Sequence, residues 1–92
     1  MPTPLEPKDY ALSYAYRASQ LAYKAVQERE LGAYKDAARL YTWAAEESEL
    51  AAKHWDRAGE ASLAAEQRAS AKVSRERASA CKMLATTKRS TR

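Results

Sequence analysis

Apolar residues recur at intervals of three and four along most of this 92-residue chain, which is the spacing of one face of an α-helix. Gly32 and Gly59, the only glycines, divide the pattern into three runs. Glycine takes the left-handed conformation that ends many helices. The prolines precede the first run, where Thr3-Pro4-Leu5-Glu6 resembles a helix start with proline in the first turn.

We therefore predict an all-α fold, an antiparallel three-helix bundle with up-down-up topology in residues 8–85. The helices are expected over residues 8–31, 33–57 and 60–85. Residues 1–7 are expected to form an N-terminal cap or a disordered segment, and residues 86–92 a basic polar tail or the start of a linker.

A single helix over residues 33–85 that dimerises as a coiled coil is the competing layout, because Gly59 costs only ~1 kcal/mol inside a helix. A coiled-coil seam needs large residues, however, and the stripe in this part of the chain is rich in alanine. The pattern favours the bundle.

The first and third helices each carry two apolar rows. In the first helix, one row holds Ala11, Tyr14, Ala15, Ala18, Leu21, Ala22 and Ala25, and the other holds Leu12, Tyr16, Tyr23 and Val26. Because each helix of a bundle touches two neighbours, both rows of the first helix are expected in the core. In the third helix, one row holds Ala65, Ala69, Val73, Ala80 and Leu84, and the other holds Ala64, Ala71, Ser74, Ala78, Cys81 and Ala85.

The second helix has the most regular stripe and, beside it, a row that a soluble helix would not need. The expected core positions are Tyr34, Ala37, Ala38, Tyr41, Ala44, Ala45, Ser48, Ala51, Ala52 and Trp55. The second row, roughly 130° away around the helix axis, holds Leu40, Trp43, Glu47, Leu50 and His54.

Composition narrows the class of protein. The 21 alanines, with no Phe or Ile and two Val, favour helix over strand. Cys81 is the only cysteine, so no internal disulfide can form and a cytoplasmic, reducing compartment fits. The start of the chain does not resemble a signal peptide, and no apolar run approaches the ~20 residues of a membrane span.

The net charge of +4 lies mainly in the last third of the chain, where residues 60–92 hold three acids and eight bases. Weak contact with anionic lipid is one expectation for this basic row, made of Arg68, Lys72, Arg75, Lys82, Lys88 and Arg89. Nucleic acid is not expected, because this third has no aromatic residue to stack on bases.

We find no pattern that predicts catalysis, a cofactor or a metal. His54 is the only histidine and has no ligand partner at a metal-binding spacing. Cys81 has no histidine base in any motif and is expected to be a buried or half-buried thiol. The sequence therefore predicts a binding module rather than an enzyme.

The same residues resemble the MIT (microtubule-interacting and trafficking) domain family over about residues 10–84. The resemblance lies in Gly32, Tyr34, Ala37, Leu40-Tyr41, Ala44 and Ala51, with Ala18, Ala22 and Ala25 upstream and Lys72, Arg77-Ala78 and Cys81-Lys82 downstream. Arg29, Ser74, Arg75 and Cys81 depart from the family pattern. Tetratricopeptide repeats share some of this logic but need a 34-residue recurrence that the chain lacks.

The resemblance implies a monomeric domain of a longer protein that binds short motifs from ESCRT-III tails and recruits an attached enzyme or complex. Such a module would act in the cytoplasm, at endosomes or other sites of membrane remodelling. A related variant serves as a scaffolding domain in a subunit of the autophagy phosphatidylinositol 3-kinase complex, and that role is the alternative.

The expected partner-binding residues are Leu40, Trp43, Glu47, Leu50, His54, Lys72 and Arg75. The row on the second helix would hold a partner's leucines beside small residues of the third helix, while Glu47, Lys72 or Arg75 would pair with charges of the motif. In the competing interpretation, the third helix packs over part of the row and Leu40 belongs to the core. A further alternative is that the row mediates self-association.

Replacing Trp43 with alanine should keep the chain helical and weaken partner binding by about 1 kcal/mol or more, as for an interface anchor. Tyr41→Ala should instead lower the free energy of unfolding. Circular dichroism and a binding titration measure both effects. A stability loss of ~3–5 kcal/mol for Trp43→Ala, typical of a truncated buried aromatic, would place this ring in the core.

Overall fold

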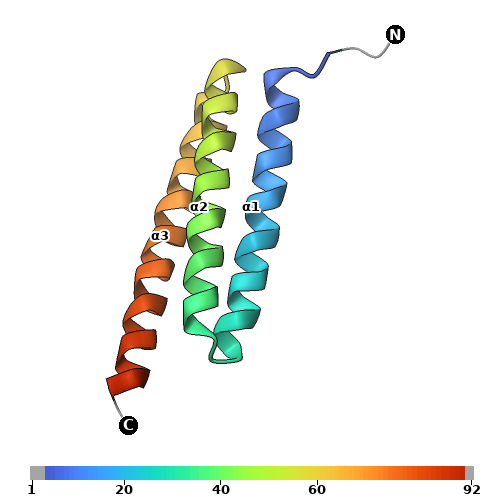
Figure 1. Ribbon diagram of the computed structural model, residues 1–92. Coiled ribbons are helices and arrows are strands. Elements are labelled where there is room, and N and C mark those ends of the chain that lie inside the picture. Colours follow the sequence, from blue (N-terminus) through green and yellow to red (C-terminus); the bar gives the residue numbers. More distant parts are fainter. Residues whose placement is uncertain (1–3, 91–92) are drawn as a thin grey trace.

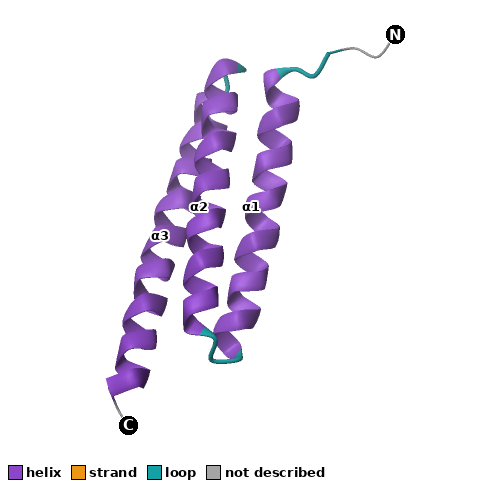
Figure 2. Ribbon diagram, in the orientation of Figure 1, coloured by secondary structure: helices purple, strands orange, loops and turns teal. Residues whose placement is uncertain are grey.

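The computed structural model describes residues 4–90, with side chains described through Thr87, and this part of the chain forms three helices (Figure 1). They are α1 (Pro7–Glu30), α2 (Tyr34–Arg57) and α3 (Ala61–Ser90). Helix α2 runs antiparallel to both α1 and α3, and Figure 2 shows only short loops between them. The predicted all-α, up-down-up three-helix architecture is confirmed.

The helix ends follow the local sequence. At the start of α1, the backbone N–H of Glu6 donates to Asp9 Oδ2 at 2.9 Å, and Pro7 occupies the first helical position. Gly32 and Gly59 have φ angles of 82° and 78°, the left-handed region in which a side chain would be strained. The residue after each glycine donates its backbone N–H to a carbonyl of the last turn at 2.9 Å, which completes a Schellman cap.

Helix α3 is longer than predicted: it continues to Ser90, whereas the predicted helix ends at residue 85. Neither glycine nor proline follows Gly59 to stop it. The hydroxyls of Thr86 and Thr87 donate to the carbonyls of Lys82 and Met83, so the polar residues of the last turns bond to their own helix. Residues 1–3 and 91–92, at the ends of the two predicted terminal segments, lie outside the described residues.

The helices form a flat layer with α2 in the middle. The Cα atoms span 60 × 26 × 13 Å. Helices α1 and α3 both pack along α2, and they barely touch each other (Figure 1). The bundle is therefore open on the side where a closed one would join its first and third helices.

Alanine makes up most of the buried residues, as the stripe of the second helix predicted. From α2 the buried set contains Ala37, Ala38, Tyr41, Ala44, Ala45, Ser48, Ala51, Ala52 and Trp55, while Tyr34 is half-buried. From α3 it contains Ala64, Ala71, Ser74, Ala78 and Cys81. The expectation of a buried thiol at Cys81 is confirmed.

The prediction that both rows of the first helix lie in the core was wrong. Of the first row, Ala11, Ala18 and Ala25 are buried and the others are half-buried. All four members of the second row are exposed, with Leu12 at 57% and Tyr16 at 65%. The reason is that α1 has one neighbouring helix and not two, since α3 packs elsewhere on α2.

Close helix contact through alanine makes the core sensitive to added volume. Ala44→Leu should lower the free energy of unfolding by about 1–3 kcal/mol, because the fully buried methyl has no space beside it for three more carbons. Ala65→Leu is the matched control, since Ala65 is exposed on α3. Urea unfolding followed by helical circular dichroism measures both, and equal values for the two variants would contradict close packing at Ala44.

Candidate functional site

Two aromatic residues of α2 hold the outer helices at a fixed separation. Tyr41 is 1% exposed and packs with Ala25 of α1 and Ala78 and Cys81 of α3. Trp55, four turns further along α2, packs with Ala11 of α1 and Ala64 of α3. Each ring therefore connects all three helices at one end of the layer.

Between these two rings the corresponding position of α2 is a serine. Ser48 lies seven residues from both Tyr41 and Trp55, so the three side chains share one face of the helix. A hydroxymethyl group is too small to bridge α1 and α3. A groove of about 900 Å³ opens above it, with Ser48 as its floor.

Most residues in the walls of this α1–α3 groove are apolar or small. From α1 they comprise Leu12, Ala15, Tyr16, Ala18, Ser19 and Ala22, and from α3 they comprise Glu66, Gln67, Ala69, Ser70, Val73, Ser74 and Arg77. Glu66 and Arg77 are the only charged residues among them, and neither forms an ion pair within the described residues. The groove therefore offers an apolar surface with one charge of each sign.

The rims of the groove continue as exposed stripes. On α1 the stripe contains Leu12, Tyr16, Ser19, Tyr23 and Val26, spaced alternately by four and three residues. On α3 it contains Glu66, Ser70, Val73 and Arg77, with the same alternation. Such spacing is typical of a helix face that packs against another helix, and among the described helices none packs on either stripe.

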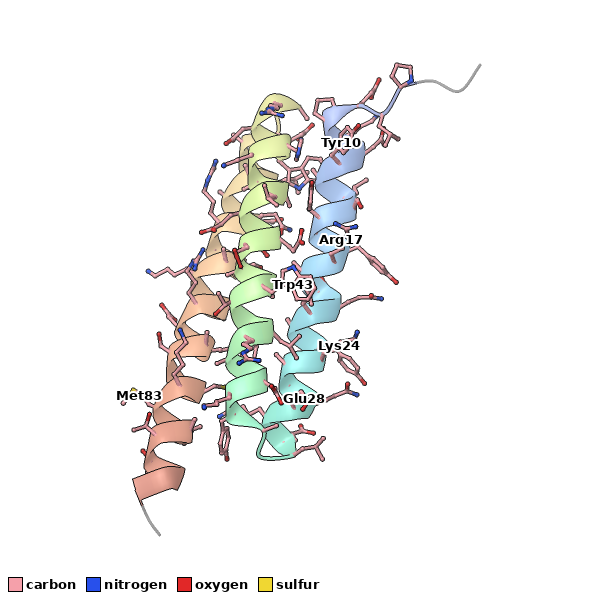
Figure 3. The ribbon with its side chains drawn as sticks, viewed as in Figure 1. Tyr10, Arg17, Lys24, Glu28, Trp43 and Met83 are labelled. Carbon is pink, nitrogen blue, oxygen red and sulfur yellow. The ribbon has the colours of Figure 1, made fainter. Side chains whose placement is uncertain are left out.

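The predicted binding row of the second helix is in part exposed, but it lies beside a different neighbour. Trp43 is 54% exposed, so its ring stays out of the core as predicted. It lines a pocket of about 300 Å³ with Arg17, Leu21 and Lys24 of α1, and Figure 3 shows its ring on the α1 side of α2. The prediction of small third-helix residues beside this row was wrong, because α1 occupies that side.

The remaining members of the row differ in burial. Leu40 is half-buried and packs against the core cluster around Tyr41, which agrees with the part of the competing interpretation that places Leu40 in the core. Leu50 is 37% exposed. Glu47 is only 8% exposed, accepts a hydrogen bond from Trp43 Nε1 at 3.1 Å through Oε1, and has no partner for Oε2 among the described residues.

His54 is half-buried and belongs to the contact between α1 and α2. Its ring stacks on those of Tyr10 and Tyr14, with centroids 5.3 and 5.4 Å away. The guanidinium of Arg17 lies 5.9 Å from the Tyr14 centroid and extends this group. The imidazole thus contributes to helix packing, which the sequence did not indicate.

Lys72 and Arg75 lie on a second surface, between α2 and α3, and are not brought together with Trp43. They line a shallow pocket of about 550 Å³ with Glu49, Arg68, Ala71, Glu76 and Ser79. Arg75 donates to both carboxylate oxygens of Glu49, at 2.6 and 3.3 Å. The hydrogen bond and then the charge of Glu49 raise the pKa of the Arg75 guanidinium.

Other members of the basic row have mixed surroundings. Arg68 pairs with Asp56 of α2, while Lys72 and Lys82 are exposed. The side chains of Lys88 and Arg89 lie outside the described residues. Because Arg68 and Arg75 already have carboxylate partners, this surface presents less net positive charge than the sequence alone indicates.

Within residues 4–90, no group of three His, Cys, Asp or Glu side chains is arranged to hold a metal ion. In the same range, none of the helices combines the length and apolarity needed to cross a bilayer. Comparison with known proteins adds no assignment: no family model matches the chain, and no match was found among curated proteins or solved structures.

The sequence of the second helix contains one sign of the groove that its apolar stripe does not reveal. Ser48 was placed in the core stripe, but its position midway between two aromatics on one helix face indicates a local gap in packing. Four of the five residues in the exposed stripe of α1 belong to the row predicted to lie in the core, so the prediction does not include the rim of the groove.

The buried carboxylate at Glu47 generates a stability prediction. Glu47→Gln should raise the free energy of unfolding by about 1 kcal/mol at neutral pH, because a neutral amide replaces a buried charge with one unpartnered oxygen and still accepts from Trp43. Glu46→Gln, at the neighbouring exposed position, should change it little. Thermal and urea unfolding measure both, and destabilisation by Glu47→Gln would mean that Arg17 or Lys24 pairs with this carboxylate in solution.

Proposed function

We propose that this chain is a non-catalytic protein-interaction module that binds a short segment of a partner in the α1–α3 groove. The groove itself, with its serine floor between two aromatic supports, is the observation that carries the proposal. Exposed apolar surface bordered by polar residues is typical of interaction sites. The proposed binding site therefore differs from the one predicted from the sequence, the row around Trp43. That row stays a prediction, as an additional binding surface.

The dimensions of the groove limit what it can hold. Its lining on α1 runs from Leu12 to Ala22, which is about 15 Å along a helix axis. That length fits about three turns of helix or about five extended residues. Because the walls consist largely of alanine and serine, the complementary ligand supplies the large apolar side chains.

The resemblance to MIT domains names the partner class. Under this proposal, the ligand is a short motif from an ESCRT-III-type tail, and the module recruits an attached enzyme or complex to endosomes or other membrane-remodelling sites. The neutral balance of the groove, with Glu66 and Arg77 at opposite ends of its α3 wall, is compatible with a motif that carries one charge of each sign.

A scaffolding role, as in the autophagy phosphatidylinositol 3-kinase complex, is the second candidate. One observation favours it: the stripe on α1 continues past the groove to Tyr23 and Val26, both exposed. A permanently bound subunit would cover this additional surface, whereas a short motif would not. Affinity distinguishes the two roles, because recruitment modules are expected to bind in the micromolar range and a stable subunit much more tightly.

Titration of the ¹⁵N-labelled chain with peptides from ESCRT-III tails should move the amide resonances of the groove residues. Val73→Glu should weaken binding at least about tenfold, because it places a charge in the apolar wall. Val73 is 42% exposed, so the substitution should not disturb folding.

Ser79→Glu, on the surface between α2 and α3, is the matched control and should keep the affinity. Resonance changes confined to the Trp43 row, with Val73→Glu binding normally, would place the site on the α1–α2 surface. If no tail peptide binds the wild-type chain, the proposed partner class is wrong.

A further inference from the structure

The groove side of the layer has the features of a surface that pairs with its own copy. Exposed side chains on α1 and α3, among them Leu12, Tyr16 and Val73, line two parallel stripes with the groove between them. Helices α1 and α2 have 24 residues each, about 36 Å along the axis, and the layer is 26 Å wide, so this face is comparable in size with the ~800 Å² that each partner buries in a standard protein interface. We propose that a second copy of this chain packs antiparallel on this face and closes the groove.

The charges on α3 select the antiparallel arrangement. Glu66 and Arg77 are eleven residues apart on one stripe, which is about 16 Å along the axis. We place a two-fold axis in the plane of the interface, perpendicular to the helices and midway between Glu66 and Arg77. This axis sets α3 of one copy against α3 of the other and brings Glu66 of each copy opposite Arg77 of its partner copy. A parallel arrangement would set α3 against the uncharged stripe of α1 and leave all four charges unpaired.

The same axis suits α1. The α1 lining runs from position 12 to position 22, and the α3 lining runs from 66 to 77. Ala11 shares a core cluster with Ala64, and Ala25 shares one with Ala78, so the centres of the two segments lie at nearly the same level of the groove. Tyr16 is one residue from the α1 centre and is 65% exposed. In the dimer its ring and the ring of its symmetry mate occupy the space above the two Ser48 side chains.

Self-association also regulates the groove, a consequence that rests on the proposed function. A groove closed by a second copy has no access for a peptide, so binding of the peptide and formation of the dimer exclude each other. A high local concentration of the chain favours the dimer, and a low concentration favours the monomer with an open groove.

Sedimentation velocity over a concentration series up to about 0.5 mM should show a monomer–dimer equilibrium with a micromolar dissociation constant. Glu66→Arg alone and Arg77→Glu alone should each weaken dimerisation at least about tenfold, because each sets like charges opposite each other. An equal mixture of the two variants should regain the dimer as a heterodimer, and the double swap Glu66→Arg/Arg77→Glu should regain the homodimer. Lys72→Glu, on the other surface, is the control and should dimerise like the wild type.

A wild-type chain that stays monomeric throughout the series overturns the inference, and so does a mixture that fails to regain the dimer. Peptide titrations at dilute, monomeric concentrations keep the two proposals separate. Peptide binding without dimerisation would refute the proposed dimer and support the proposed function. Dimerisation without peptide binding would support the dimer and refute the proposed function.

Discussion

The fold depends on the close packing of α1 and α3 against the alanines of α2. Three pairs of adjacent alanines, Ala37–Ala38, Ala44–Ala45 and Ala51–Ala52, repeat every seven residues and are all buried. Adjacent residues of a helix point about 100° apart, so each pair presents one methyl group towards α1 and one towards α3. The central helix can therefore hold both neighbours without those neighbours touching.

This arrangement explains why the layer is open. Helices that approach through methyl groups lie close to α2, but the space between α1 and α3 must be filled by something larger. Tyr41 and Trp55 fill it at two levels, and on all three helices the residues of these clusters are fourteen positions apart: Ala11 and Ala25, Tyr41 and Trp55, Ala64 and Ala78. The groove is the interval between two such supports, and its length follows from this spacing.

The elements and the core of α2 could be predicted from the sequence, because both depend on local rules. Glycine ends a helix wherever it takes a positive φ, and the alanine stripe is visible as a period. The position of α3 could not be predicted in the same way. Periodicity states which side of a helix is apolar, but it does not state which neighbour covers that side, so Trp43 was assigned to the wrong helix pair.

The roles of His54 and Arg75 show the same limit at the level of single residues. A histidine on the outer row has the same pattern whether it faces water or, as here, two tyrosines of α1. The charged residues of α3 have one spacing whether they are solvated or paired with Glu49 and Asp56. Whether such a side chain is solvated or paired depends on residues that are distant in the sequence. The sequence pattern alone does not identify those residues.

The 13 Å thickness of the layer has a thermodynamic consequence. A protein one to two helices thick has little interior remote from water, so its resistance to heat comes from few buried contacts. Any molecule that settles on the broad face gives those helices a second buried side and adds a large fraction to the total apolar contact. By mass action, occupancy then raises the melting temperature. The rise per kcal/mol is larger than in a large domain, because the entropy of unfolding of a small domain is small.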